Sequence, residues 1–154
     1  MRKSLQKIVL AIAVTGTLHI AYAADPKPEE EIRYRQSAFN VIGRNFNALG
    51  AIAKGERPYD QAFAVKTAAL LELLAPLPFG SFGPGTDKGA LNKADPKIWT
   101  EQAKYKEAAE KFQVEIAKLS AAAKDLNSLK AQVGEIGKTC KGCHDDFRLK
   151  EARQ

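Results

Sequence analysis

Metal-binding side chains are scarce in this sequence. The 154 residues contain two cysteines, two histidines and one methionine. His19 and Met1 lie near the N-terminus, so residues 24–154 contain a single histidine, His144, and no methionine. A metal site in residues 24–154 must therefore draw its sulfur and imidazole ligands from one short segment, Cys140–His144.

Long hydrophobic runs are also scarce. One apolar run, from Ile8 to Ile20, follows three basic residues and ends at Ala21-Tyr22-Ala23. This order is typical of a secretory signal peptide, and the run is too short for a membrane anchor. We expect residues 1–23 to be cleaved and the chain to be exported. Residues 24–154 would form a single domain without membrane insertion.

Little excess charge remains once that leader is removed. The whole chain has 24 basic and 18 acidic residues, a formal charge of +6. Three basic and no acidic residues lie in residues 1–23, which leaves +3 for the exported chain. Such a small surplus, on basic residues that alternate with acidic ones, excludes the electrostatic footprint of a nucleic-acid-binding protein and a polybasic membrane patch.

Strand signals are absent, whereas apolar residues recur at the alternating steps of three and four that indicate helices. Four helices are predicted: from Pro28 to between Gly50 and Gly55, from Pro58 to Pro76, for about 27 residues from Asp95-Pro96, and from Leu129 to the C-terminus after a turn at 125–128. The proline- and glycine-rich stretch 75–96 is predicted to be a long crossover loop without regular structure. The fold class is therefore all-α, an antiparallel four-helix bundle with a long crossover loop between helices 2 and 3.

The same periodicity predicts which side chains face the core. In the first helix these are Ile32, Phe39, Ile42, Phe46 and Leu49, with Arg35 among them. In the second helix the expected buried residues are Ala62, Phe63, Val65, Ala69, Leu70 and Leu73. In the third they are Ile98, Tyr105, Ala109, Phe112, Ile116, Leu119 and Ala123, and in the fourth Leu129, Val133, Ile136, Cys140, Cys143 and Phe147.

Both cysteines lie in Cys140-Lys141-Gly142-Cys143-His144, directly before the one histidine of residues 24–154. C-x-x-C-H is the attachment signature of c-type haem. Two thiols at this spacing add to the two haem vinyl groups, and the adjacent imidazole reaches the iron from the same side. The sequence predicts one haem c, covalently attached through Cys140 and Cys143, with His144 as an axial iron ligand.

Three other uses of this segment compete with haem attachment. A disulfide between the two cysteines would close a very short loop and add little stability. A thioredoxin-like redox pair would be expected beside a βαβ pattern, which the sequence lacks. A zinc ion would need a fourth ligand, for which Asp145 is a poor candidate.

The composition also limits the ligand on the opposite side of the iron. Methionine and a second histidine, the usual sixth ligands of electron-transfer haems, are absent from residues 24–154. A five-coordinate iron is therefore expected, with lysine, tyrosine or the amino terminus as the remaining alternatives.

Three side chains are candidates for contact with the haem. Phe39 lies on the apolar face of the first helix and could cover the open side of the iron, or simply belong to the core. Arg35, one turn earlier, would be costly to bury without a partner, and a haem propionate would provide one. Arg148 follows His144 by one helical turn and would flank the imidazole, or else extend into water.

The whole exported chain resembles class II cytochrome c′. The resemblance is carried by Tyr34-Arg35-Gln36-Ser37-Ala38-Phe39, by Phe79 and Phe82-Gly83-Pro84-Gly85-Thr86, and by Cys140 to Arg148. It implies a four-helix bundle with a high-spin, five-coordinate haem c, often in a homodimer. It also implies that Arg35 and Gln36 lie near the propionates, that Phe79 and Phe82 contact the cofactor, and that Arg148 lies beside the proximal histidine.

The resemblance further implies binding of nitric oxide and carbon monoxide in the bacterial periplasm. Phe39 departs from the family pattern, which commonly has leucine or methionine at the distal position. A one-electron carrier in a respiratory or denitrification chain, with redox partner proteins, is the alternative function, although five-coordinate iron disfavours it. A peroxidase would need a distal base, and no distal histidine is available in residues 24–154. We therefore expect a protein that is not an enzyme.

Overall fold

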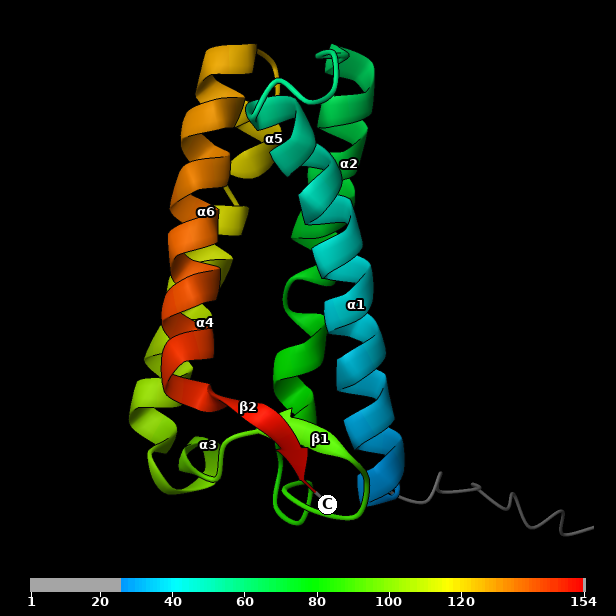
Figure 1. Ribbon diagram of the computed structural model, residues 1–154, viewed down its shortest axis with the longest axis vertical. Helices are drawn as coiled ribbons and strands as arrows, with labels where there is room; N and C mark the ends of the chain where they lie inside the picture. Colours follow the sequence, from blue (N-terminus) through cyan, green and yellow to red (C-terminus); the bar gives the residue numbers. More distant parts are fainter. Residues whose placement is uncertain (1–25, 154) are drawn as a thin grey trace, which may run out of the picture.

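The computed structural model describes residues 26–153, so the predicted signal peptide over residues 1–23 lies outside the described residues. Four long helices dominate the described part: α1 (Pro28–Ala53), α2 (Gln61–Leu74), α4 (Gln102–Ile116) and α6 (Leu126–Phe147). The shorter elements are η1 (Leu77–Ser81), β1 (Asn92–Ala94), α3 (Lys97–Thr100), α5 (Leu119–Ala122) and β2 (Arg148–Arg153). Figure 1 shows the long helices packed side by side, which confirms the predicted helical bundle.

Helix α1 begins and ends where the sequence predicts. Pro28 occupies its first turn, where the missing backbone N–H costs nothing, and three glutamates favour the positive end of the helix dipole. The backbone N–H of Lys27 also donates to the Glu30 carboxylate at 3.2 Å. At the other end, Gly55 has a φ of +79°, a conformation that suits glycine, and the helix stops.

Helix α2 buries a different face from the one predicted. The Asp60 side chain accepts a hydrogen bond from the backbone N–H of Phe63 at 3.0 Å and caps the helix. The buried residues are Ala64, Thr67, Ala68 and Leu71. Of the six predicted residues, Phe63 and Val65 are half-buried, whereas Ala62, Ala69, Leu70 and Leu73 are exposed.

The reason is that α2 is apolar on all sides, so its period does not select a face. The segment Gln61–Ser81 has a mean hydropathy of 1.5, long and apolar enough to cross a membrane by composition alone. It is not one straight helix, because α2 ends at Leu74 and Pro76 leads into η1. The core helix of a soluble protein can meet the same criterion, so one such segment is weak evidence for a membrane span; 33% of the apolar window is buried here, which leaves side chains such as Leu70 and Leu73 exposed.

The predicted third helix is divided into three pieces, α3, α4 and α5. Glu101, with φ −116° and ψ 46°, separates α3 from α4, and a second break separates α4 from α5. The predicted apolar face nevertheless continues across both breaks, and its fully or largely buried members are Ile98, Ala109, Phe112, Ile116, Leu119 and Ala123.

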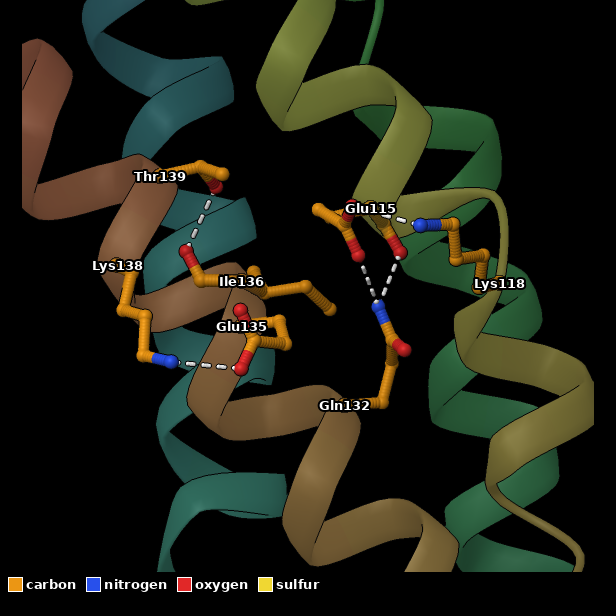
Figure 2. A network of polar contacts seen from close by, with 7 residues as sticks. All are labelled: Glu115, Lys118, Gln132, Glu135, Ile136, Lys138 and Thr139. Atoms are coloured by element: carbon orange, nitrogen blue, oxygen red, sulfur yellow. Dashed lines mark hydrogen bonds and ion pairs between the residues drawn. The ribbon is translucent and has the colours of Figure 1, made fainter.

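A polar network connects the second of these breaks to α6. Figure 2 shows the amide of Gln132, on α6, directed toward Glu115 of α4. The Gln132 Nε2 donates to the backbone oxygen and to the carboxylate of Glu115, each at 2.9 Å. The same carboxylate accepts from Lys118 at 2.7 Å. The break is thus held in place by side chains of α4 and α6.

The crossover loop and the C-terminus contain regular structure that the sequence does not predict. The 3-10 helix η1 and strand β1 lie within residues 75–96, and α6 stops at Phe147 where β2 begins. Strands β1 and β2 pair in antiparallel fashion across the end of the bundle (Figure 1). The partners lie far apart in the sequence, so local periodicity cannot reveal them.

One end of the bundle has a purely aliphatic core, which we call the aliphatic end: Leu49, Ile52, Ala64, Ala68, Leu119, Ala123 and Leu129. These side chains are 0–1% exposed. The opposite end contains η1, the β1–β2 sheet and the C-terminal turns of α6 (Figure 1).

Candidate haem site

The C-x-x-C-H segment occupies the last turns of α6. Cys140 and Cys143 are both half-buried free thiols, three residues apart and therefore on one face of the helix. Cys140 packs against the buried core of the bundle. His144 lies next to that face, one turn before the helix ends at Phe147.

The protonation state of the two thiols does not suit thiol redox chemistry. Burial, with a contribution from Cys143, raises the pKa of Cys140 to about 11, and burial also raises the pKa of Cys143. Redox-active cysteines instead have a lowered pKa that yields the reactive thiolate. Desolvation and the charge of Arg148 lower the pKa of His144, while Asp145 acts in the opposite direction. A neutral imidazole keeps the lone pair that a metal ligand needs.

An unbroken group of aromatic rings lies at this end of the bundle. We call it the ring cluster: Phe39, Phe79, Phe82, Trp99, Tyr105, Phe112 and Phe147. The rings come from α1, η1 and its C-cap, α3, α4 and α6. Unlike the aliphatic end, most of the cluster is only half-buried.

Phe39 lies inside the ring cluster and not in the aliphatic core. Its ring meets Phe79 edge-on at 5.7 Å between centroids and Phe82 at 6.4 Å. The structure thus brings together three of the predicted haem contacts, one from α1 and two from the crossover loop. Their contact with the cofactor itself stays a prediction.

Arg35 is 2% exposed and is held by the crossover loop. Its Nη1 donates to the backbone oxygen of Ser81 at 2.8 Å and to the Thr86 hydroxyl at 3.1 Å, and its Nη2 donates to the Thr86 backbone oxygen at 2.8 Å. The guanidinium also stacks over Phe82, 4.3 Å from the ring centroid.

A propionate is expected at Arg35 because a buried guanidinium needs hydrogen-bond partners. In the structure Ser81 and Thr86 provide those partners, so burial no longer requires a propionate. A propionate contact at Arg35 therefore stays a prediction that only the resemblance supports. Gln36 is likewise engaged, since its Nε2 donates to the Leu91 backbone oxygen at 2.8 Å.

The helical placement of Arg148 is wrong. Arg148 is the C-cap of α6, with an extended backbone (φ −122°, ψ 120°), and begins β2. Its side chain is exposed, and its backbone N–H donates to the His144 backbone oxygen. Strand pairing with Ala94 draws the chain out of the helix at this point. Arg148 still lies close enough to His144 to affect the pKa of the imidazole.

Four ring-cluster residues have no role in the sequence-based site prediction: Trp99, Tyr105, Phe112 and Phe147. The last three fit the helical apolar period, which marks core and cofactor contacts alike. Trp99 is the one tryptophan of the chain, and its Nε1 donates to the Gly83 backbone oxygen at 3.0 Å. Clustering in space, which the sequence does not display, identifies all four.

The residues present fit a covalently attached haem. Within residues 26–153 no group of three or more His, Cys, Asp and Glu side chains is placed to hold a bare metal ion. The segment instead offers two thiols on one helix face, an imidazole beside them, and a half-buried surface of aromatic rings. A flat apolar macrocycle with two vinyl groups matches that set of contacts.

Comparisons with known proteins agree with this geometry. A family model described as Cytochrome C′ matches residues 30–148. The chain is 47% identical over 126 residues to a cytochrome c′ of Rubrivivax gelatinosus, an alignment that covers 80% of this chain and 98% of the relative. The crystal structure of cytochrome c′ from that organism matches with a TM-score of 0.77, covering 79% of this chain and 97% of the other.

Two further solved structures hold gases. A carbon monoxide-bound leucine-to-glycine variant of cytochrome c prime from Alcaligenes xylosoxidans matches at 42% identity with a TM-score of 0.75. A ferrous arginine-to-alanine variant of that protein with bound NO matches at 41% identity with the same TM-score. Each alignment covers 80% of this chain and 98% of the other. By family match, identity and fold together, the chain belongs to the cytochrome c′ family, whose members are non-enzymatic proteins with a c-type haem.

Proposed function

We propose that this protein is an exported protein that binds the diatomic gases NO and CO at a single haem c, which is attached through Cys140 and Cys143 and has His144 as its iron ligand. The observation that carries the proposal is the C-x-x-C-H segment on α6 beside the ring cluster, in a chain similar to proteins whose structures hold NO and CO. When bound, the haem supplies an iron atom to which a diatomic gas can coordinate.

The absence of a second strong ligand leaves room for that gas. Residues 24–154 contain one histidine and no methionine, so His144 has no counterpart on the opposite side. Phe39, supported by Phe79 and Phe82, would cover that opposite side with apolar rings and keep water out. A gas must displace these packed rings to reach the iron, so steric contact with the rings would determine the relative affinities of the iron for NO and CO.

Charged and polar residues would hold the rim of the cofactor. On the strength of the resemblance we assign Arg35 and Gln36 to the propionate side; their hydrogen bonds to Ser81, Thr86 and Leu91 fix both side chains to the crossover loop. Arg148 would flank the proximal imidazole from β2. Each of these side chains acts by positioning the cofactor or His144.

The exposed face of α2 supports a homodimer. Leu70, Leu73 and Leu77 are 40%, 75% and 42% exposed, and they lie at helical spacing in α2 and the η1 segment that follows it. Exposed apolar side chains at this spacing favour association with a like surface. We further propose that the protein resides in the bacterial periplasm, that residues 1–23 are a signal peptide, and that residues 24–154 form a single domain. The family match starts at residue 30 and α1 at Pro28, both after the predicted cleavage site.

Optical spectra of the purified protein test the gas-binding proposal. A reduced-minus-CO difference spectrum should show a high-spin ferrous haem that converts to a six-coordinate CO complex. A low-spin spectrum that CO does not change would refute it. Rapid electron exchange with a partner cytochrome, together with no CO response, would favour the alternative of a one-electron carrier.

Size-exclusion chromatography with light scattering tests the dimer. Wild type should have twice the mass of one chain, and Leu73→Asp should have the mass of one chain. Exposed Val114→Asp, on α4, is the matched control and should leave the dimer intact.

A further inference from the structure

Tyr105 has a buried hydroxyl that the protein does not satisfy. Its Oη atom is shielded from solvent and has no hydrogen-bond partner among residues 26–153. The ring is enclosed by Phe82, Phe79 and Phe147, with centroid distances of 5.2, 6.4 and 5.6 Å. A phenylalanine would make the same ring contacts without burying an unpaired hydroxyl, so the packing alone does not explain a tyrosine here.

A second tyrosine of the chain shows the contrasting case. Tyr59, near the aliphatic end, is also partly buried, and its hydroxyl donates to the Ala123 backbone oxygen at 2.9 Å. The bundle can therefore provide an acceptor for a tyrosine hydroxyl where one is needed. At Tyr105 it provides only rings.

The surroundings of Tyr105 point toward the cofactor. Burial raises the pKa of its hydroxyl well above the ordinary value, Cys143 raises it further, and Arg35 acts in the opposite direction. The phenol is therefore neutral at physiological pH and can donate a proton to a hydrogen bond. Cys143 and Arg35 are the two residues proposed above to bind a haem vinyl group and to lie on the propionate side, and both are close enough to Tyr105 to affect its pKa.

We propose that the Tyr105 hydroxyl donates a hydrogen bond to an acceptor oxygen that arrives with the haem: either a propionate oxygen or the outer atom of a gas bound to the iron. Two other donors at this end of the bundle already have partners: Ser81 and Thr86 accept from Arg35, and Gly83 accepts from the Trp99 indole. Tyr105 is the buried donor at this end that has no partner among residues 26–153; the other buried unpaired hydroxyl, that of Ser120, lies on α5. The inference rests on the haem attachment proposed above.

The test compares haem-loaded Tyr105→Phe with wild type, and Tyr59→Phe is the matched control. Two vibrational bands distinguish the two acceptors. If the acceptor is the bound gas, Tyr105→Phe raises the C–O stretching frequency of the ferrous CO complex and speeds CO dissociation roughly fivefold, the loss of one ordinary hydrogen bond. If it is a propionate, the propionate bending band in the resonance Raman spectrum shifts and the C–O stretch does not.

Tyr59→Phe should change neither band, because its hydroxyl bonds to a distant backbone oxygen. Deuterium exchange of wild type gives a second reading without any substitution, since a band that accepts from an O–H shifts in heavy water. Unchanged bands in both experiments overturn the role of Tyr105. A pyridine haemochrome count of one haem per chain in Tyr105→Phe would show that the attachment proposal stands even then.

Discussion

The two ends of the bundle are filled in different ways. At the aliphatic end, residues such as Leu49, Leu119 and Leu129 are completely buried by other side chains of the same protein. At the ring cluster, Phe39, Phe82 and Tyr105 are half-buried, and one hydroxyl lacks a partner among residues 26–153. The aliphatic side chains are thus covered by the protein itself, although the Ser120 hydroxyl on α5 is also buried without a partner, whereas we propose that the cofactor covers the half-buried rings.

Charge is also distributed unequally between the ends. The end with the ring cluster contains a buried guanidinium, two half-buried thiols and the phenol of Tyr105, whereas most of the buried side chains at the aliphatic end are hydrocarbon, and the carboxylates Asp60 and Asp125 lie in exposed helix caps. Burying hydrocarbon stabilises a fold with little geometric demand, but buried polar groups require specific partners. We therefore expect mutations at the aliphatic end to alter stability alone, and mutations at the ring cluster to alter stability and haem properties together.

Removing the haem should have the largest effect. The double variant Cys140→Ala, Cys143→Ala loses several hundred square ångströms of apolar contact with the macrocycle, on the order of 10 kcal/mol. Stable helix should be lost, as measured by circular dichroism during heating. A cooperative unfolding transition near the wild-type midpoint in the haem-free variant would contradict this and would show that the ring cluster is complete without the cofactor.

A cavity at the aliphatic end should have the next largest effect. Leu129 is 0% exposed, so Leu129→Ala should lower the free energy of unfolding by about 3 to 5 kcal/mol. Urea titration measures the loss, and the exposed neighbour Lys130→Ala serves as control. The absorption spectrum and CO affinity of the folded variant should match wild type. A change in either would mean that the two ends are not independent.

Loss of the buried guanidinium should follow. Arg35→Leu leaves the acceptors on Ser81 and Thr86 without their donor and should cost about 2 to 3 kcal/mol. Because these acceptors belong to the crossover loop, the haem absorption spectrum should also change. The exposed Arg44→Leu on the same helix is the control. A neutral or stabilising Arg35→Leu, measured by urea titration at moderate salt, would mean that the loop does not depend on this residue.

The smallest expected effect concerns gas entry. Phe39→Ala removes a ring that a distal gas must displace, and should raise CO affinity at least tenfold, about 1.4 kcal/mol, while His144 stays bound to the iron. Phe46→Ala, two turns further along α1 and packed against the buried core, should leave CO affinity unchanged. Equal CO affinities for wild type and Phe39→Ala in an equilibrium titration would return Phe39 to an ordinary packing role.

The sequence predicts this fold where local physics decides it. Pro28 and Asp60 mark helix starts because proline geometry and side-chain capping act within one turn. The sequence-based prediction of the buried face fails for α2, because apolar residues surround this helix. The prediction also misses strand β2, because its partner β1 is distant in the sequence. The error at Arg148 follows directly from the missed strand.

The candidate site shows the same difference between residues recognisable from local sequence and residues recognisable only from the folded structure. Cys140, Cys143 and His144 are recognisable because a covalent reaction fixes their spacing. Tyr105 and Trp99 are not, because their importance depends on which rings they meet in space. The partners of Arg35 also could not be predicted, since Ser81 and Thr86 reach it only when the crossover loop folds back onto α1.

The pairing of β1 with β2 has a consequence for the timing of folding. Asn92 pairs with Arg153 and Ala94 with Arg148, and the backbone N–H of Asp95 donates to the Phe147 backbone oxygen at 3.0 Å. These contacts join residues with a high sequence separation, and such contacts form late because closing a long loop costs chain entropy. The strand that closes this end begins at Arg148, four residues after His144. We therefore expect β2 to come into register after the helices form, so that haem attachment on α6 can precede the closing of this end of the bundle.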